Sequence, residues 1–236
     1  MRDPFATPAH HFPQIWLLFA SLVFLGFGIL YDLELLQPVF ALDRSHVTAL
    51  IAALVLTGSL HAVWHISLYS RRIEAARKAL SNARLATQQG AILTASDDPY
   101  IAAWTTDIAQ AGKLEAGHLE ELYELYADRL RSPVDLGWFL VDVTIRLGLL
   151  GTILGFILIF TSLSGLSIEG AEGLRDLLVA MSGGMGTALF TTLAGLIGAT
   201  LLSVQYLVLG RQAEHLLGLL SRYRAARGRE TGVTDA

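Results

Sequence analysis

Long apolar stretches alternate with polar, charged segments along this chain of 236 residues. Four of the apolar stretches approach or exceed the roughly 20 residues with which a helix crosses a ~30 Å hydrocarbon core. They cover residues 14–31, 47–68, 137–163 and 174–209. At ~1.5 Å per residue the last would be about 50 Å long, so we expect it to tilt or to protrude into water. The pattern predicts an all-α, polytopic membrane protein with four transmembrane helices.

The polar segment between the second and third spans also has the pattern of helices. Residues 70–95 are rich in Ala, Arg, Leu and Gln, and Asp97-Asp98-Pro99 is a helix-start signal. Residues 115–131 place five large side chains on one face at a period of 3.6: Leu119, Leu122, Tyr123, Tyr126 and Leu130. We therefore expect helical extensions of the spans, or a short helical hairpin between them.

Lys and Arg residues cluster after the second and fourth spans, whereas the loops after the first and third spans are mainly acidic. The positive-inside rule therefore predicts that both termini and the segment between the two hairpins are cytoplasmic. The small, polar, basic composition after Arg222 favours disorder. The predicted regions are a cytoplasmic N-terminal segment (1–13), a first transmembrane hairpin (14–68), a cytoplasmic helical segment (69–136), a second hairpin (137–210) and a cytoplasmic tail (211–236).

Composition narrows the classes of function. The chain is 53% hydrophobic and 16% charged, which fits a membrane protein, and it has no cysteine for disulfides or thiolate chemistry. His61 and His65 stand one turn apart, but no third metal ligand accompanies them. A membrane enzyme or small-solute transporter would need a buried acid/base pair or broken helices, and the spans show neither. We expect no enzyme activity, no metal and no cofactor.

Small and hydroxyl-bearing residues recur in the last two spans where a plain span would carry leucine. One stripe of the third span consists of Thr144, Gly148, Gly151 and Gly155, with Thr152 beside it. The fourth span has two stripes, one of Ala188, Thr192, Gly195 and Ala199, and one of Gly183, Thr187, Thr191 and Ala194. One interpretation is close helix packing, for which two small faces on one helix suit a ring of subunits. The other is a polar site on a narrow ion path.

Both segments resemble signatures of one family. Leu147–Gly155 is similar to the third-span signature of the MotA/TolQ/ExbB proton channel family, and Thr187–Gly195 resembles the signature of its final span. The order and spacing also match, and the resemblance covers residues 142–206. TolQ and ExbB carry a glutamate where this chain has Thr187, and MotA has a larger cytoplasmic domain. The chain therefore looks like a member outside the best-known branches.

The resemblance implies a function in concrete terms. Family members form a five-fold ring in the bacterial inner membrane, around two copies of a single-span partner similar to MotB, TolR or ExbD. An aspartate in the partner's span binds the moving ion, and ring threonines, here Thr152 and Thr192, line its path. Ion flow then drives rotation or other mechanical work, as in a stator. The expected ion is H⁺, and Thr187 and Thr191 keep Na⁺ open because hydroxyl oxygens can replace water around a hard cation.

Several other residues have two possible interpretations each. Asp142 and Arg146 are one helical turn apart, which predicts either a structural ion pair or a site that admits the ion. Five charged residues of the 69–136 segment are either membrane anchors and solvated side chains or contacts with a partner: Arg71, Arg72, Arg77, Glu120 and Glu124. The rival to the whole motor hypothesis is a non-conducting membrane scaffold whose Gly/Thr stripes serve only packing and assembly.

Overall fold

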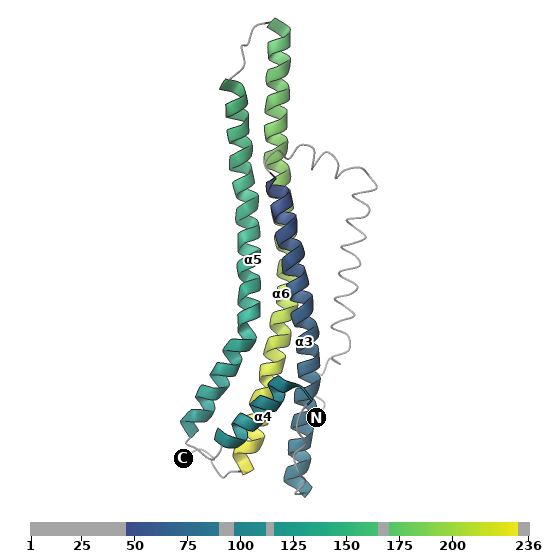
Figure 1. Ribbon diagram of the computed structural model, residues 1–236, viewed down its shortest axis with the longest axis vertical. Helices are drawn as coiled ribbons and strands as arrows, with labels where there is room; N and C mark the ends of the chain where they lie inside the picture. The colour runs from purple at the N-terminus through teal and green to yellow at the C-terminus, as the bar shows by residue number, and fades with distance from the viewer. Residues whose placement is uncertain (1–45, 90–96, 112–115, 165–169, 231–236) are drawn as a thin grey trace, which may run out of the picture. The chain divides into compact units, whose positions relative to one another are not determined.

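The computed structural model describes residues 46–89, 97–111, 116–164 and 170–230, and the regular structure in these segments is α-helical (Figure 1). The helices are α3 (Val47–Gln89), α4 (Pro99–Ala111), α5 (Ala116–Ser164) and α6 (Gly170–Glu230). The predicted all-α fold is confirmed for these residues. The first predicted span, residues 14–31, lies outside the described residues and stays a prediction.

Three of the helices are long and apolar enough to cross a membrane. Their candidate spans are Val47–Asn82 in α3, His118–Thr161 in α5 and Gly173–Ala225 in α6. These segments include the second and fourth stretches predicted from the sequence, and all of the third except its last two residues. The helices extend well beyond those stretches, as expected, because the flanking polar segments keep strong helix formers such as Ala, Leu, Arg and Glu.

Helix α5 joins two predicted elements, the helix at 115–131 and the span at 137–163. Pro133 lies inside it. Proline lacks the N–H that would bond to the carbonyl of Arg129, but long helices tolerate such a loss at a single point. At the C-terminal end the expectation of disorder is wrong for residues 222–230, which continue α6. Their Arg and Ala residues favour helix more than their polarity opposes it.

The start of α4 confirms the signal read from Asp97-Asp98-Pro99. The Asp98 carboxylate oxygen Oδ1 accepts hydrogen bonds from the backbone N–H groups of Tyr100 (2.9 Å) and Ile101 (3.1 Å). It therefore serves as the N-cap for two donors that have no partner within the helix. Pro99 takes the first helical position, where its missing N–H costs nothing.

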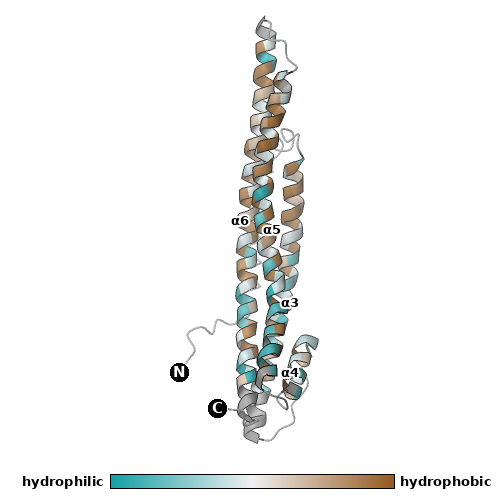
Figure 2. Cartoon of the chain, turned by 90° about the vertical axis from the view of Figure 1, so that its left-hand side faces the viewer, coloured by the Kyte–Doolittle hydropathy of each residue, from teal (hydrophilic) through white to brown (hydrophobic). Residues whose placement is uncertain are grey.

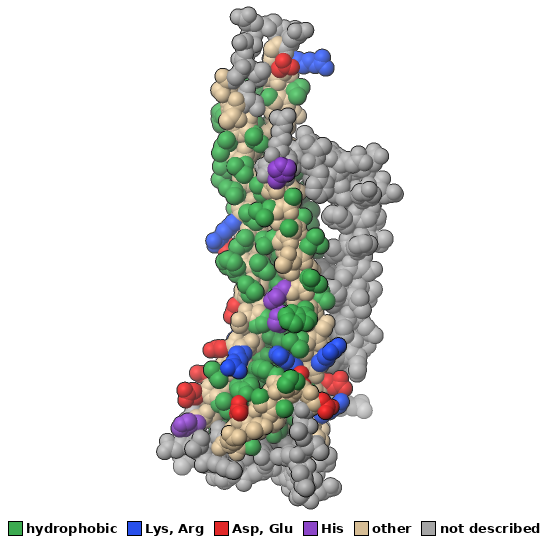
Figure 3. Space-filling view, viewed as in Figure 1, with side chains coloured by type: hydrophobic (Ala, Val, Ile, Leu, Met, Phe, Trp, Pro, Cys, Tyr) green, Lys and Arg blue, Asp and Glu red, His purple; other side chains and the backbone are tan. Residues whose placement is uncertain are grey.

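The described helices form two compact units, which we treat separately. Unit 1 contains the described parts of residues 62–136 and 206–236, and unit 2 those of residues 14–61 and 137–205. Helix α4 belongs to unit 1, while α3, α5 and α6 each contribute a segment to both. Hydrophobic colouring dominates the unit 2 segments of α5 and α6, and hydrophilic colouring is denser around α4 (Figure 2). Charged side chains gather mainly on unit 1 (Figure 3).

The core of unit 1 is built from large side chains of all four helices. Trp104 of α4, Leu130 of α5 and Leu216 of α6 are fully buried. The buried Tyr69 of α3 donates its hydroxyl hydrogen to the carbonyl of Leu130 at 2.7 Å. Unit 2, by contrast, has few large buried side chains, and its helices meet through small residues.

Candidate functional site

Four of the glycines singled out from the sequence, Gly148, Gly151, Gly155 and Gly195, lie where α5 and α6 touch in unit 2. A Cβ atom added to Gly195 would lie 2.8 Å from the Cα of Gly148, and one added to Gly148 would lie 3.1 Å from the Cα of Gly195. Both distances are tighter than ordinary van der Waals contact, so the two backbones are themselves in contact. Only glycine permits this approach on both sides.

The same contact continues along both helices. A Cβ atom on Gly155 would lie 2.7 Å from the carbonyl oxygen of Gly184, and one on Gly151 would overlap the side chain of Thr191. All the residues of the predicted α5 stripe, Thr144, Gly148, Gly151 and Gly155, are buried. Gly184 was missed by the sequence analysis, although its small-xxx-small spacing with the buried Ala188 was a usable signal.

Three threonine hydroxyls are enclosed within this contact. Thr144, Thr187 and Thr191 are each 0% exposed. Their hydroxyls donate to backbone carbonyls one turn earlier at 2.7, 3.1 and 2.9 Å respectively. Such bonds satisfy a hydroxyl inside an apolar helix pair. Of the four predicted ion-path threonines, Thr187 and Thr191 therefore lie inside the packing of unit 2 and away from its surface.

The other two predicted ion-path threonines are half-buried and reach the surface of unit 2. Thr152 donates its hydroxyl hydrogen to the carbonyl of Leu149 at 2.6 Å. Thr192 has two acceptors within reach, the carbonyl of Ala188 in its own helix at 3.1 Å and that of Gly148 in α5 at 3.3 Å. Thr152 follows Gly151, which meets Thr191, so both hydroxyls lie along the stretch where α5 and α6 are in close contact.

The two predicted stripes of α6 do not make two separate packing faces in the structure. Thr187 and Thr191 of the second stripe join the face that packs on α5, whereas a Cβ on Gly183 would meet nothing within 4 Å. The second helix that α6 contacts in unit 2 is α3. A Cβ on Gly198 would crowd Val55, and one on Gly58 would lie 2.9 Å from a methyl group of Leu202.

Asp142 and Arg146 form an ion pair in unit 2, with Nη2 and Oδ2 separated by 2.5 Å. Both side chains are on the surface, 50% and 72% exposed respectively. Large exposed apolar side chains surround them along α5, including Trp138, Phe139 and Leu149. The pair therefore interrupts an outward face that is otherwise apolar.

In unit 1, helix α4 is held by aromatic and cationic contacts. The Arg72 guanidinium lies 4.4 Å from the ring centre of Tyr100, whose hydroxyl donates to the carbonyl of Tyr126 at 2.9 Å. The Tyr126 hydroxyl in turn donates to Asp107 at 2.6 Å. Burial raises the pKa of Tyr100 well above its usual range, and the positive charge of Arg72 opposes this only in part. Arg72 is thus occupied within the chain.

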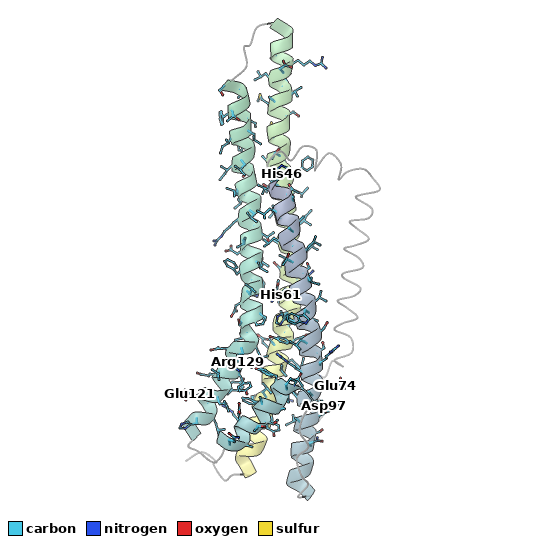
Figure 4. All side chains as sticks on the ribbon, viewed as in Figure 1. His46, His61, Glu74, Asp97, Glu121 and Arg129 are labelled. Atoms are coloured by element: carbon cyan, nitrogen blue, oxygen red, sulfur yellow. The ribbon has the colours of Figure 1, made fainter. Side chains whose placement is uncertain are left out.

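The other charged residues predicted to contact a partner fall into two groups: two have contacts within unit 1, and two are exposed. Glu120 accepts a hydrogen bond from Arg224 of α6 at 2.5 Å, and Arg77 lies 3.2 Å from the His215 ring. Arg71 and Glu124 are exposed. Exposed acidic side chains occur on both sides of unit 1, with Glu121 on α5 and Glu74 and Asp97 at the opposite side of the view (Figure 4).

The ionisable groups limit the chemistry that unit 2 can perform. The sequence has no Asp, Glu, Lys, Arg or His between Arg146 and Ser164 in α5, or between Asp176 and Arg211 in α6. Among the described residues no group of three or more His, Asp or Glu side chains is placed to hold a metal ion. What these helices do offer at the glycine contact is two half-buried hydroxyls, those of Thr152 and Thr192, on apolar surface.

Comparison with known proteins supplies the family. A search of curated proteins and a search of solved structures gave no match to the chain. Residues 114–221 match the model of the MotA/TolQ/ExbB proton channel family. The match includes both signature segments, the whole α5–α6 glycine contact and the two half-buried threonines. Residues 114–221, just under half of the chain, are therefore those of the MotA/TolQ/ExbB proton channel family, and this match, together with the three long apolar helices, supports a multi-pass membrane subunit of the ion-channel type.

Proposed function

We propose that the chain is the ring-forming channel subunit of an ion-driven motor or energy transducer in the bacterial inner membrane. Five copies surround two copies of a single-span partner similar to MotB, TolR or ExbD. The ion moves between the ring and an aspartate in the partner's span, and its flow drives rotation or other mechanical work. The family match supports the channel subunit, and the ring, the partner and the work are the proposal.

The observation that carries the proposal is the position of Thr152 and Thr192. Their hydroxyls are the polar groups that α5 and α6 bring to the surface of unit 2 at the glycine contact, within the matched segment. A hydroxyl that faces acyl chains gains nothing there, so these residues are better explained by a neighbouring polar path. The close backbone contact fixes both hydroxyls at the same level.

The distribution of charged residues in the chain supports the presence of a partner protein. A proton relay within a membrane normally uses a titratable side chain, and the membrane stretches of α5 and α6 beyond Arg146 have none. A second protein that contributes a carboxylate would complete the path. The chain alone supplies hydroxyl oxygens, which can coordinate an ion or order water but cannot titrate near neutral pH.

Replacement of Thr192 by Val tests this function. The change keeps the shape of the side chain and removes the oxygen. A lost hydrogen bond to a charged species costs about 1.5–3 kcal/mol, which lowers ion flux roughly 10- to 150-fold. We expect that fall in dye-reported proton flux through proteoliposomes that contain the chain and its single-span partner, with the oligomer intact by native mass spectrometry.

Thr161→Val is the matched control. Thr161 is an exposed threonine of α5 whose hydroxyl donates to its own helix, at the carbonyl of Leu158. We expect this variant to keep its flux. Unchanged flux in Thr192→Val, with an intact oligomer, would favour the scaffold hypothesis and refute the channel proposal.

We also propose that the ion is H⁺. The extra hydroxyls that would favour Na⁺ belong to Thr187 and Thr191. Both side chains are fully buried, and their hydroxyls donate to carbonyls of their own helix. Na⁺ needs several oxygens to replace its hydration shell. We expect the same activity when K⁺ replaces Na⁺ at constant pH and ionic strength. An activity that disappears without Na⁺ would contradict this assignment.

A further inference from the structure

The Asp142–Arg146 pair lies at a level of unit 2 where the neighbouring helices are apolar. Leu140 and Thr144, which flank Asp142, lie beside Gly58 of α3 and Gly198 of α6 respectively. From Gly198 the next charged residue along α6 is Arg211, 13 residues or about 20 Å away. From Gly58 the next along α3 is Arg71, at a similar spacing. The pair thus lies within the apolar belt that α3 and α6 define.

Lipid is a poor environment for this pair. Ionised side chains inside a membrane almost always face a protein interior or a water-filled cavity, because acyl chains give no compensating interaction. Yet both side chains are at least half exposed in the single chain. One ion pair also leaves most of the five N–H donors of Arg146 without a bond. A second polypeptide that covers this face would remove both costs.

We infer that the outward face of α5 around Asp142 and Arg146 is covered by α6 of a second copy of this chain. The inference rests on the ring of the proposed function and identifies the surface by which its copies meet. Copies related by an axis along the helices keep the same level, so Asp142 of one copy lies level with residues 198–202 of the next. The exposed hydroxyl of Thr200 lies in that segment and offers the ion pair a polar contact.

Length favours α6 of the neighbour over its α3. The exposed apolar side chains of α5 in unit 2 continue from Trp138 to Phe160. Those of α6 continue from Leu174 to Val204, which is long enough to cover them. The unit 2 segment of α3 ends at His61 and begins only at Val47, so it covers a shorter part of that face. A face of one helix against a different helix of the next copy is a heterologous contact, and such contacts build a ring when the rotation between copies closes.

Cysteine cross-linking tests the contact directly, because the chain has no cysteine of its own. The test pair is Ile145→Cys with Thr200→Cys, since Ile145 is an exposed neighbour of Arg146. Oxidation of membranes that contain the double variant should give a ladder of dimers, trimers and larger species on a non-reducing gel. Each single variant should give no ladder, because a heterologous contact needs both positions.

A second double variant controls for random collisions. Leu178→Cys is exposed on α6 but lies 20 residues from Gly198, about 30 Å along the helix. Disulfides need Cα atoms within about 7 Å, so Ile145→Cys with Leu178→Cys should give no ladder. The absence of a ladder from the Thr200 pair, in a chain that native mass spectrometry shows to be oligomeric, overturns the inference. So does a cross-link from position 145 to the single-span partner alone.

Charge variants give an independent readout. Asp142→Asn and Arg146→Gln each leave one charge without its partner at a covered interface, so the ratio of ring to monomer should fall at least about tenfold. The exchanged pair, Asp142→Arg with Arg146→Asp, should restore most of it. Equal ring fractions in all four chains would also overturn the inference.

The two proposals fail in different ways. If Thr192→Val conducts normally while the Thr200 ladder forms, the channel mechanism fails and the contact stands. If Thr192→Val loses flux while the oligomer shows no ladder, the mechanism stands and the contact fails. A chain that is monomeric in membranes refutes both.

Discussion

Replacement of Gly195 by Leu is expected to break the contact between α5 and α6. Even a Cβ atom at this position would lie 2.8 Å from the Cα of Gly148 and 3.2 Å from the carbonyl oxygen of Thr144. Backbone atoms cannot move aside as a flexible side chain can, so the helices must separate. Overpacking typically costs about 1–3 kcal/mol, and more where backbones collide. The midpoint of thermal unfolding in detergent should fall accordingly, with loss of ion flux.

Gly183→Leu is the matched control on the same helix. A Cβ atom there would meet nothing within 4 Å, and leucine favours helix over glycine by up to about 1 kcal/mol. The stability of the single chain in detergent should therefore be unchanged or higher. Equal destabilisation by the two substitutions would show that helix propensity, and not the backbone contact, governs this part of α6.

Trp104→Ala is expected to release α4 from unit 1. The indole is fully buried and packs edge-to-face on Tyr126, with ring centres 5.0 Å apart, and on Tyr123 at 6.2 Å. Truncation of a buried Trp to Ala costs about 3–5 kcal/mol. Amide hydrogen exchange over residues 99–111 should accelerate strongly, because α4 has only 13 residues and Trp104 is its largest buried side chain.

Trp104→Phe separates packing from hydrogen bonding in this position. The indole Nε1 is buried without a hydrogen-bond partner among the described residues. Phenylalanine keeps much of the apolar contact and removes a polar atom that gains nothing from burial. It should therefore preserve slow exchange in α4. Fast exchange in the Phe variant would mean that Nε1 has a partner, such as a bound water.

The sequence predicted the features of the site that depend on local spacing. The α5 stripe from Thr144 to Gly155 and the cap at Asp98 follow from helical periodicity and from capping chemistry. A stripe of small residues shows that a face is packed, but it does not identify the neighbour. The contact of Gly198 with α3 and the enclosure of Thr187 and Thr191 therefore became visible only in three dimensions.

The charged residues show the same limit. Arg72 and Glu120 have the composition of a surface available to partners, yet each is engaged within unit 1, by Tyr100 and by Arg224. These contacts join residues 28 and 104 positions apart. No local pattern specifies such pairs. The spacing of Asp142 and Arg146, by contrast, is local, and the pair that it predicts is present in the structure.

Thr192 has a single hydroxyl hydrogen and two carbonyls to share it, one in each helix. Whichever carbonyl takes the hydrogen, the lone pairs of the oxygen are left to face the other way. The Thr152 hydroxyl donates to a carbonyl of its own helix, so the lone pairs of its oxygen also face away from the acceptor. The two side chains thus present electron-rich oxygens without a formal charge, so they attract hydrogen-bond donors and cations and repel anions. For the proposed channel, we therefore expect the direction of these two hydrogens to favour cations over anions.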